Sequence, residues 1–386
     1  MKFVQMVVMI ITLAACSSQD DTMTSLSENL PDTTSISFNI VTAVTHADEN
    51  YFSGFREVML TSNHDLVIQD GRKQILLWFD SDGNFIGTIG REGRGPGEFT
   101  DIRHVLMAPG DTLHVFDRNN ARHQIFAIRD ENWTQVRETP LRMDFSEEMN
   151  SYFPSDVYLM DGELIGRFRN NIGIRDTTTM YHQWFSHINT DMKPVNGEKH
   201  MLQPLQEAVV IRENSSVVTI YFSESFQLFT QIEPGTNLIH TVRNDDAVIR
   251  MFDIEGNELR TISLPREVVP IDESSQKEYL SQLRQFYDNN TARLAESKYL
   301  PHQPFVKQFI LDDRGRYWVM INRKDKSKPN WFVVDQEGHM LGGFRMDLDG
   351  INEDAFQLSA VQGNRLYAHS LKEDEPILLV IDAEFD

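Results

Sequence analysis

One motif recurs along the chain and limits the possible folds more than any other feature. An apolar strand end is followed by Asp-x-x-Gly and a second apolar run, and the clearest copies begin at Phe79, Phe252 and Val334. Asp can hydrogen-bond its own backbone two residues on, and Gly accepts the positive φ that closes a tight turn. Each copy therefore predicts a β-hairpin.

Three weaker copies begin at Ile128, Ile188 and Ile381. The first has Asn132 in the place of Gly, and Asn tolerates positive φ best after Gly. The second lacks the glycine, which predicts a different turn there. The third meets the end of the chain.

A second signal precedes each copy, namely a polar turn followed by a short apolar or alternating strand. The six strands begin at Asp65, Asp111, Gly162, Asn237, Gly315 and Gly363. The hairpins recur at intervals of 49, 60, 64, 82 and 47 residues, and four-stranded propeller blades repeat every ~40–50 residues. We therefore predict an all-β, six-bladed β-propeller of four-stranded antiparallel blades over residues 36–386.

The widest interval contains a segment, residues 272–300, that does not have a strand pattern. Ser275 and Glu278 have the spacing of a capping box, and the apolar residues that follow have helical spacing. Those residues are Tyr279, Leu280, Leu283, Phe286, Tyr287 and Leu294. We predict a helical insertion that ends before Pro301, and a packing role for it is favoured over that of a substrate lid.

The two ends of the chain predict how the ring closes. The last repeat is one strand short when the chain stops at Asp386, whereas residues 35–41 alternate polar and apolar side chains with no partner nearby in sequence. Pairing residues 36–41 with residues 377–382 would complete the last blade and remove an open edge. The alternative is that residues 36–41 continue a disordered segment.

The N-terminus has the pattern of an exported lipoprotein. Lys2 precedes a run of 13 mostly apolar residues, too short to span a bilayer, so residues 1–15 are predicted to be a signal peptide. The run ends in Leu-Ala-Ala followed by Cys16, the only cysteine of the chain, which predicts lipidation at Cys16 over an ordinary signal with an incidental cysteine. Ser17 rather than Asp follows it, which favours the outer membrane of a Gram-negative host. Residues 16–35 are predicted to be the lipidated cysteine and a flexible tether.

Charge limits the partners. The formal net charge is −22. The negative potential that it produces repels phosphate backbones, so nucleic acid is not an expected partner. The membrane is expected through the lipid anchor, and a protein or glycan ligand would bind through the loops that propeller blades present around one axis.

The run from Ile89 to Phe99, with sequence IGREGRGPGEF, resembles the glycine-rich link between blades of NHL-repeat propellers. Together with the lipobox, the hairpins and the helical insertion, it makes the chain similar to the six-bladed β-propeller lipoproteins of Bacteroidetes. The resemblance implies a fold and a cell-envelope location, but no assigned reaction. Pro96 and Phe99 do not fit a phosphate-binding loop, which requires a Gly-Lys-Ser/Thr ending or a βαβ unit.

No established catalytic motif occurs in the sequence, and we assign no catalytic, cofactor-binding or metal-ligating residue and no cofactor. Histidines on expected strands could face the central channel, namely His104, His114, His123, His182, His187, His240 and His369. The polar stretch from Asp117 to Arg122 could bind a ligand, although a surface turn is favoured. The sequence favours a membrane-anchored binding or scaffolding module over a metal-dependent hydrolase or lyase, since fold analogy alone is a weak argument for a reaction.

Overall fold

The computed structural model describes most of the chain after the N-terminal segment. The described residues are 23–25, 30, 35–47, 50–141, 154–160, 162–171, 178–189, 192–197, 199–213, 216–220, 225–233, 236–286, 296, 300–346, 351, 355–372 and 375–385. Cys16 and the signal peptide lie outside them.

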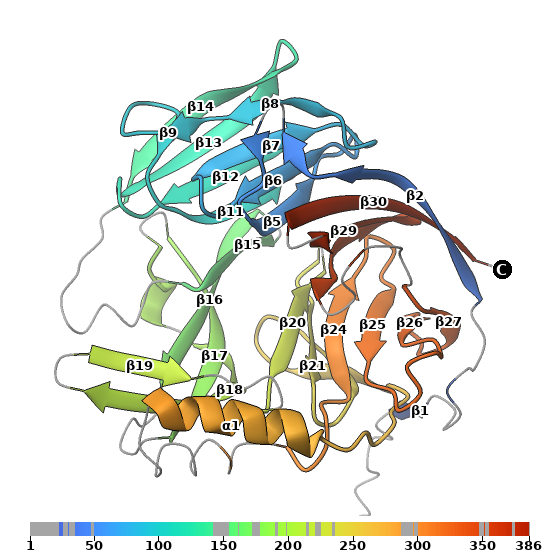
Figure 1. Cartoon of the computed structure of the whole chain (residues 1–386). Helices are drawn as coiled ribbons and strands as arrows, with labels where there is room; N and C mark the ends of the chain where they lie inside the picture. Colours follow the sequence, from blue (N-terminus) through green and yellow to red (C-terminus); the bar gives the residue numbers. More distant parts are fainter. Residues whose placement is uncertain are drawn as a thin grey trace, which may run out of the picture.

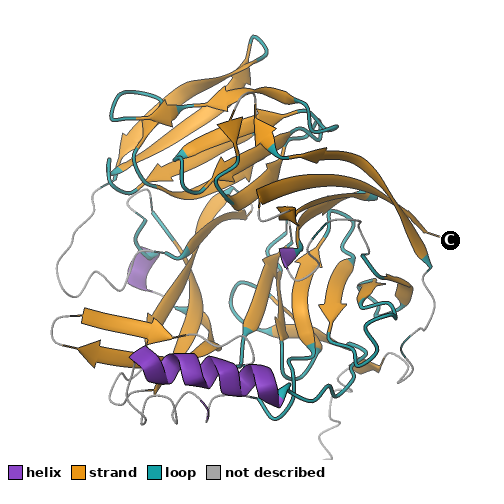
Figure 2. Cartoon of the chain, viewed as in Figure 1, coloured by secondary structure: helices purple, strands orange, loops and turns teal. Residues whose placement is uncertain are grey.

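Six antiparallel sheets follow one another along the chain and surround one axis as the blades of a propeller (Figures 1 and 2). Blade 1 contains β5 (Phe55–Leu60), β6 (Leu66–Asp70), β7 (Ile75–Phe79) and β8 (Phe85–Ile89). Blade 2 contains β11 (Ile102–Ala108), β12 (Thr112–Asp117), β13 (Arg122–Arg129) and β14 (Asn132–Pro140). Blade 3 contains β15 (Asp156–Met160), β16 (Glu163–Asn171), β17 (Thr178–His187), β18 (His200–Glu213) and an additional strand, β19 (Ser216–Ile220).

The second half of the chain repeats this arrangement. Blade 4 contains β20 (Leu228–Ile232), β21 (Ile239–Arg243), β22 (Val248–Phe252) and β23 (Glu258–Ser263). Blade 5 contains β24 (Val306–Leu311), β25 (Tyr317–Ile321), β26 (Trp331–Val334) and β27 (Met340–Phe344). Blade 6 contains β28 (Gln357–Gln362), β29 (Arg365–Lys372), β30 (Glu375–Phe385) and β2 (Ile36–Val44). The prediction of six four-stranded blades is confirmed.

Short elements connect the blades. Two small pairs, β3 (His46–Ala47) with β4 (Asn50–Tyr51) and β9 (Arg91–Glu92) with β10 (Glu98–Phe99), lie before and after blade 1 in the chain. A 3-10 turn, η1 (Val195–Gly197), precedes β18. None of the helices among the described residues is long and apolar enough to cross a membrane.

The core is divided into six hydrophobic clusters, and one lies at each contact between neighbouring blades. Between blades 5 and 6, for example, Trp318 and Trp331 pack with Leu366 and Leu379, and all four side chains are fully buried. Because each blade uses both faces for such contacts, the second and third strands are almost continuously apolar, as expected for strands that are covered on both sides.

The ring is closed by the two ends of the chain. β2 pairs antiparallel with β30, with Ile36 opposite Phe385 and Ile40 opposite Ile381, and the two strands lie side by side in Figure 1. Ile36 is 1% exposed and belongs to the cluster between blades 5 and 6. The predicted pairing of residues 36–41 with residues 377–382 is therefore confirmed, and the strand continues to Val44.

The segment before β2 follows the outside of the ring. Ser35 exchanges hydrogen bonds with Gly343 on β27, through its amide at 2.9 Å and its hydroxyl at 3.0 Å. Leu30 packs against the cluster between blades 4 and 5, and β1 (Met23–Ser25) pairs in parallel with β23 of blade 4. We call residues 23–25, 30 and 35–44 the N-terminal belt. Residues 23–25, 30 and 35 of the belt therefore contact blades 4 and 5, within the segment 16–35 for which the sequence predicts a flexible tether.

The recurrent turns obey one hydrogen-bond pattern. At Asp80 the amide of Gly83 donates to the Asp80 carbonyl at 3.0 Å, and the amide of Asn84 donates to the Asp80 carboxylate at 2.8 Å. At Asn189 the amides of Met192 and Lys193 form the same two bonds, at 3.0 and 3.1 Å. The expectation of a different turn at Ile188 is wrong, because Met192 adopts the positive φ (62°) that glycine adopts elsewhere.

The other two weak copies differ from the motif. In blade 2 a two-residue turn is closed by positive φ at Asp130 and Glu131, so Asn132 does not replace the glycine but begins β14. In blade 6 there is no turn after Ile381, because β30 continues to Phe385 and its partner β2 comes from the other end of the chain. The strand pairing therefore corrects the expected role of Asn132 and shows that the copy at Ile381 is not a hairpin.

The predicted insertion contains one long helix, α1 (Glu273–Phe286). It begins two residues before Ser275, and Asp272 caps it by accepting hydrogen bonds from the amide and hydroxyl of Ser274 at 3.1 and 2.8 Å. The capping box at Ser275 and Glu278 therefore does not mark the start of the helix. Leu280 is 3% exposed, so it lies on the side of the helix that faces the protein. Residues 287–295, with Tyr287 and Leu294, lie outside the described residues.

Strand direction divides the propeller into two faces. The turns after first strands and after third strands, which include the Asp-x-x-Gly turns, lie on one face, here called the hairpin face. The first strand of each blade begins on the opposite face. Residues near the starts of β5, β11 and β15 are therefore gathered on that opposite face, close to the axis.

Candidate functional site

Charged and polar side chains from three successive blades gather near the axis on the face opposite the hairpins. They interact electrostatically with one another across blade boundaries. We call this group the axial cluster, and it consists of Arg56, Glu57, Arg103, His104, Asp156, Tyr158 and Arg167. Neighbouring first strands contact each other around the axis, from β5 to β11 and from β11 to β15.

Asp156 and Arg167 form the fixed part of the axial cluster. They face each other across the β15–β16 pair, and Arg167 donates to one Asp156 oxygen through Nε at 2.8 Å and through Nη2. Burial alone would raise the pKa of Asp156, but the Arg167 guanidinium holds it below its usual value. This ion pair is therefore charged at neutral pH.

Arg56 and Arg103 form the cationic part. Arg56 donates to the Ile102 carbonyl at 3.3 Å, so its side chain reaches the next blade. Arg103 is partly buried, and its Nε–H is buried without a hydrogen-bond partner among the described residues. Burial and then the nearby Arg56 lower the pKa of Arg103. The two guanidinium groups thus repel each other, and neither forms an ion pair with a carboxylate in the part of the chain that the structure describes.

Backbone bulges present these cations. The pairing of β5 with β6 skips one residue at Arg56, and that of β11 with β12 skips one at Arg103. The same irregularity occurs at Lys307 in blade 5 and at Ser359 in blade 6. A bulge bends the strand and redirects a side chain. Three of these four bulged positions carry a positive charge near the axis.

Glu57 lies beside these cations. Part of the residue is exposed to solvent although its carboxyl group is surrounded by protein, and it forms no hydrogen bond or ion pair with the residues that the structure describes. The surrounding protein restricts its hydration, and this effect together with Asp156 raises the pKa of Glu57 to about 7, against the opposing influence of Arg56 and Arg167. At neutral pH its carboxyl group is present in both protonation states.

The raised pKa of Glu57 predicts a pH-dependent stability. The folded state binds the Glu57 proton more tightly than the unfolded chain, so the contribution of Glu57 to stability falls as pH rises from about 4.5 to about 7. We expect Glu57→Gln to melt like the wild type near pH 4.5 and above it near pH 8. Thermal denaturation across that range measures the difference. Glu131→Gln, in the exposed turn of blade 2, is the control. A difference that does not change with pH would contradict the assignment.

The histidines named from the sequence do not gather at one point. His104 contacts the Pro154 carbonyl at 2.9 Å, and burial lowers the pKa of His104 to about 4. The ring nitrogens of His114 and His123 are 3.2 Å apart within blade 2. The remaining partners are the Met180 carbonyl for His182, Glu163 for His187, Tyr317 for His240 and Ser359 for His369.

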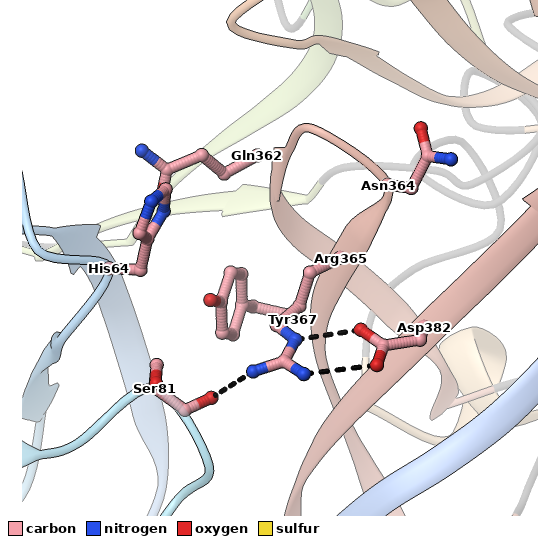
Figure 3. A pocket seen from close by; sticks show the side chains of 7 residues that line it. All are labelled: His64, Ser81, Gln362, Asn364, Arg365, Tyr367 and Asp382. Carbon is pink, nitrogen blue, oxygen red and sulfur yellow. Dashed lines mark hydrogen bonds and ion pairs between the residues drawn. The ribbon is translucent and has the colours of Figure 1, made fainter.

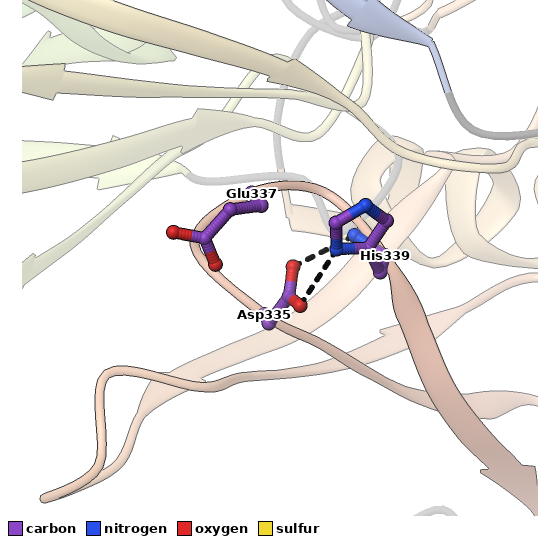
Figure 4. A group of neighbouring side chains, drawn as sticks. All are labelled: Asp335, Glu337 and His339. Carbon is purple, nitrogen blue, oxygen red and sulfur yellow. Dashed lines mark hydrogen bonds and ion pairs between the residues drawn. The ribbon is translucent and has the colours of Figure 1, made fainter.

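One group of three potential metal ligands occurs among the described residues, on the exposed turn of blade 5 (Figure 4). Asp335 accepts a hydrogen bond from the His339 amide at 2.7 Å and contacts the His339 ring at 2.9 Å. Glu337 lies in the same turn and is exposed. These contacts repeat those of the Asp80 turn, so they are explained by hairpin closure.

The polar stretch from Asp117 to Arg122 is a structural turn. Asp117 is fully buried and accepts hydrogen bonds from the amides of Thr100 and Asp101 at 3.0 and 3.1 Å. Arg122 donates to the carbonyls of Gly95 and Glu98 at 2.8 and 2.6 Å. The stretch therefore holds the glycine-rich link in place. In that link Gly90 has φ of 69°, and a side chain there would meet the Phe99 ring.

His104 is the one member of the axial cluster that was a candidate from its sequence pattern. A usable signal was present, because Phe55-Arg56-Glu57-Val58 and Ile102-Arg103-His104-Val105 share an apolar–Arg–polar–Val pattern at the start of their blades. The bulges at Arg56 and Arg103 interrupt the alternation of inward- and outward-facing side chains along β5 and β11. The strand pattern alone therefore did not place these residues on the same face. The proposed lipidation site, Cys16, lies outside the described residues.

Comparison with known proteins confirms the fold. A family model described as "6-bladed beta-propeller" matches residues 32–174, which extend from β2 into blade 3. The resemblance to six-bladed propellers stated from the sequence is therefore confirmed. No curated protein sequence matches the chain significantly.

Solved structures share the fold at low identity. A Bacteroides fragilis protein described as exported is 13% identical, with a TM-score of 0.55 over 95% of this chain and 100% of that one. A member of the DUF4221 family from Bacteroides vulgatus is 9% identical, with a TM-score of 0.50 over 92% and 99%. A gluconolactonase from Xanthomonas campestris is 10% identical over 90% and 89%, and its TM-score of 0.40 carries no argument about function.

Proposed function

We propose that this six-bladed propeller is a lipid-anchored binding module of the cell envelope that captures a small anionic ligand at the axial cluster. The observation that carries the proposal is the pair of guanidinium groups of Arg56 and Arg103, which come from the contacting strands β5 and β11 and form no ion pair with a carboxylate among the described residues. An anion between them would relieve their repulsion and provide an acceptor for the buried Nε–H of Arg103. Charge-assisted hydrogen bonds of this kind are the stronger ones in proteins.

The charge distribution supports this choice. The chain has a formal net charge of −22, yet the axial cluster contains three arginines and two carboxyl groups. One of these carboxylates, Asp156, is already bound by Arg167, and the other, Glu57, is only partly ionised at neutral pH. The cluster is therefore locally cationic in an acidic protein, which favours a small anion over a cation or a nucleic acid.

The distribution of exposed apolar side chains argues against a large protein-binding surface. Five of them lie on the outer strands of five different blades, at Ile40, Ile86, Val136, Leu259 and Leu341. Sites that bind proteins present contiguous apolar patches. A polar site of limited size near the axis is better suited to a small ligand.

The alternative of a metal-dependent hydrolase or lyase receives less support from the same residues. Guanidinium groups have no acceptor atom and do not ligate metal ions. Glu57 is the one residue that favours a reaction, because a carboxyl group with a pKa near 7 suits general acid–base catalysis. If mass spectrometry showed that the protein converts a bound ligand into a product during titration, that result would favour the enzyme alternative.

The proposal predicts that Arg103→Met will weaken anion binding. We expect calorimetric titration with inorganic phosphate, sulfate and D-glucuronate to identify at least one binding anion. Loss of one charge-assisted hydrogen bond at about 1.5–3 kcal/mol corresponds to roughly 10- to 100-fold weaker binding. The melting temperature without ligand should not fall, since a like-charge repulsion is removed.

Arg129→Met is the matched control, because Arg129 lies at the exposed end of β13. It should bind the same anion as the wild type does. The proposal is wrong if none of the three anions binds, or if Arg103→Met and the wild type bind with equal affinity.

A further inference from the structure

A polar cavity lies on the hairpin face, between blades 6 and 1, and is separate from the axial cluster. It has a volume of about 300 Å³, at the lower end of the range for small-ligand pockets. Its walls come from the turns after β5 and β7 and from β28, β29 and β30, with His64, Gln362, Tyr367 and Arg365 around it (Figure 3). We call it the closure groove, since blade 6 is the blade completed by β2.

Two buried polar atoms in this groove have no partner among the described residues. Tyr367 is fully buried, and its hydroxyl forms no hydrogen bond. The side-chain carbonyl oxygen of Gln362 is also buried and unbonded. Leaving such a group unsatisfied costs about 1–3 kcal/mol. The other fully buried tyrosine among the described residues does not show this, because the hydroxyl of Tyr317 lies 3.0 Å from Nδ1 of His240.

The charged groups of the groove are already neutralised. Arg365 donates to both oxygens of Asp382, at 2.7 and 3.0 Å, and to the Ser81 carbonyl at 3.0 Å, as Figure 3 shows. This arrangement holds the wall of the groove rigid but provides no free charge. The remaining groups are a phenol hydroxyl, a side-chain amide and the exposed ring of His64. They can donate and accept hydrogen bonds without attracting an ion.

We propose that the closure groove binds a neutral, hydroxyl-rich molecule of the size of one sugar unit, such as the terminal residue of a glycan. The hydroxyl groups of a sugar can donate to the Gln362 carbonyl oxygen and accept from the Tyr367 hydroxyl, which would satisfy both unbonded atoms. A charged ligand is disfavoured, because it would lose its hydration beside Arg365 and Asp382, whose charges already neutralise each other. The groove therefore differs from the axial cluster in both its position and the chemistry of its ligand.

The experiment is a titration of the full mature protein with a panel of methyl glycosides, followed by NMR and by calorimetry. The panel consists of methyl glucoside, methyl galactoside, methyl mannoside and methyl N-acetylglucosaminide. We expect one of them to bind with a Kd on the order of 1 mM, as is usual for a single small polar ligand with few contacts. Tyr367→Phe should weaken that binding by roughly 5- to 10-fold, because it removes one hydrogen bond of about 1 kcal/mol. Gln362→Met should have a similar effect.

Tyr317→Phe is the control for damage to the fold. It removes a buried hydroxyl that is hydrogen-bonded in blade 5, so it should lower the melting temperature and leave glycoside binding unchanged. The inference is overturned if none of the four glycosides binds, since the groove would then hold water only. It is also overturned if Tyr367→Phe and Gln362→Met bind the glycoside as the wild type does. These outcomes do not affect the axial cluster, which is tested with anions and with Arg103→Met.

Discussion

Removal of residues 17–42 will lower the melting temperature of the propeller sharply, whereas removal of residues 17–33 will leave it close to that of the mature protein. The longer deletion removes most of β2, the strand that pairs with β30 from Ile36 onward. It exposes the edge of blade 6 and removes the fully buried side chain of Ile36. Loss of a large buried aliphatic side chain alone costs about 2–5 kcal/mol, so we expect a decrease on the order of 10 °C.

The shorter deletion is the matched control, because it also removes β1 but keeps Ser35 and β2. The three-residue pairing of β1 with β23 lies at the outer edge of blade 4, and its loss should change the melting temperature little. Differential scanning calorimetry of the three proteins measures the effect. If both deletions melt like the mature protein, the N- and C-terminal strands do not hold the ring closed in solution.

Replacement of Cys16 by Ser will abolish lipid attachment, an all-or-none effect. The lipid is expected to be attached through the thiol of Cys16, and a serine hydroxyl cannot form the thioether. Since Cys16 is the only cysteine, no other residue can substitute for it. We expect the variant to accumulate as an unprocessed precursor that incorporates no radiolabelled fatty acid in the producing bacterium.

Ser17→Ala is the control, and it should be processed and labelled normally. Lipid labelling of Cys16→Ser at the wild-type level would mean that the N-terminal pattern is not a lipobox. Normal processing without lipid in both proteins would indicate an ordinary signal peptide. The fold should be unaffected in either variant, because the described blades begin well after this position.

Much of the fold could be predicted because propeller blades are built from local signals. Turn residues such as Asp80 and Gly83 fix a hairpin within five residues. Four such turns, together with the strand signal that precedes the motif in all six repeats, define six blades. Ring closure could be predicted for a different reason, namely that residues 36–41 had a strand pattern without a neighbour. The turn at Met192 was mispredicted because surrounding strand pairing overrides the preference for glycine, at a cost that a single position can bear.

The candidate sites were less predictable, because they depend on contacts between blades. Arg56 and Arg103 are 47 positions apart and meet only when blades 1 and 2 are placed side by side. The bulges at these arginines also shift the alternation of side chains along the strand by one residue, so a period of two does not identify them as channel-facing positions. Tyr367 belongs to the strand that the sequence predicts from Gly363 onward, and nothing in that pattern marks its hydroxyl. That its hydroxyl has no partner follows from the packing of blade 6 against blade 1 and not from its sequence neighbours.

The N-terminal belt has a consequence for how an anchored molecule would stand on a bilayer. With lipid on Cys16, as proposed, only the seven residue-to-residue steps from Cys16 to Met23 lie between the acyl chains and blade 4, a reach of at most about 25 Å. A segment that stayed loose as far as Ile36 would reach about 70 Å. Such a short connection would hold the outer edge of blade 4 within that distance of the acyl chains, so the propeller could not move away from the bilayer as it would on a long tether.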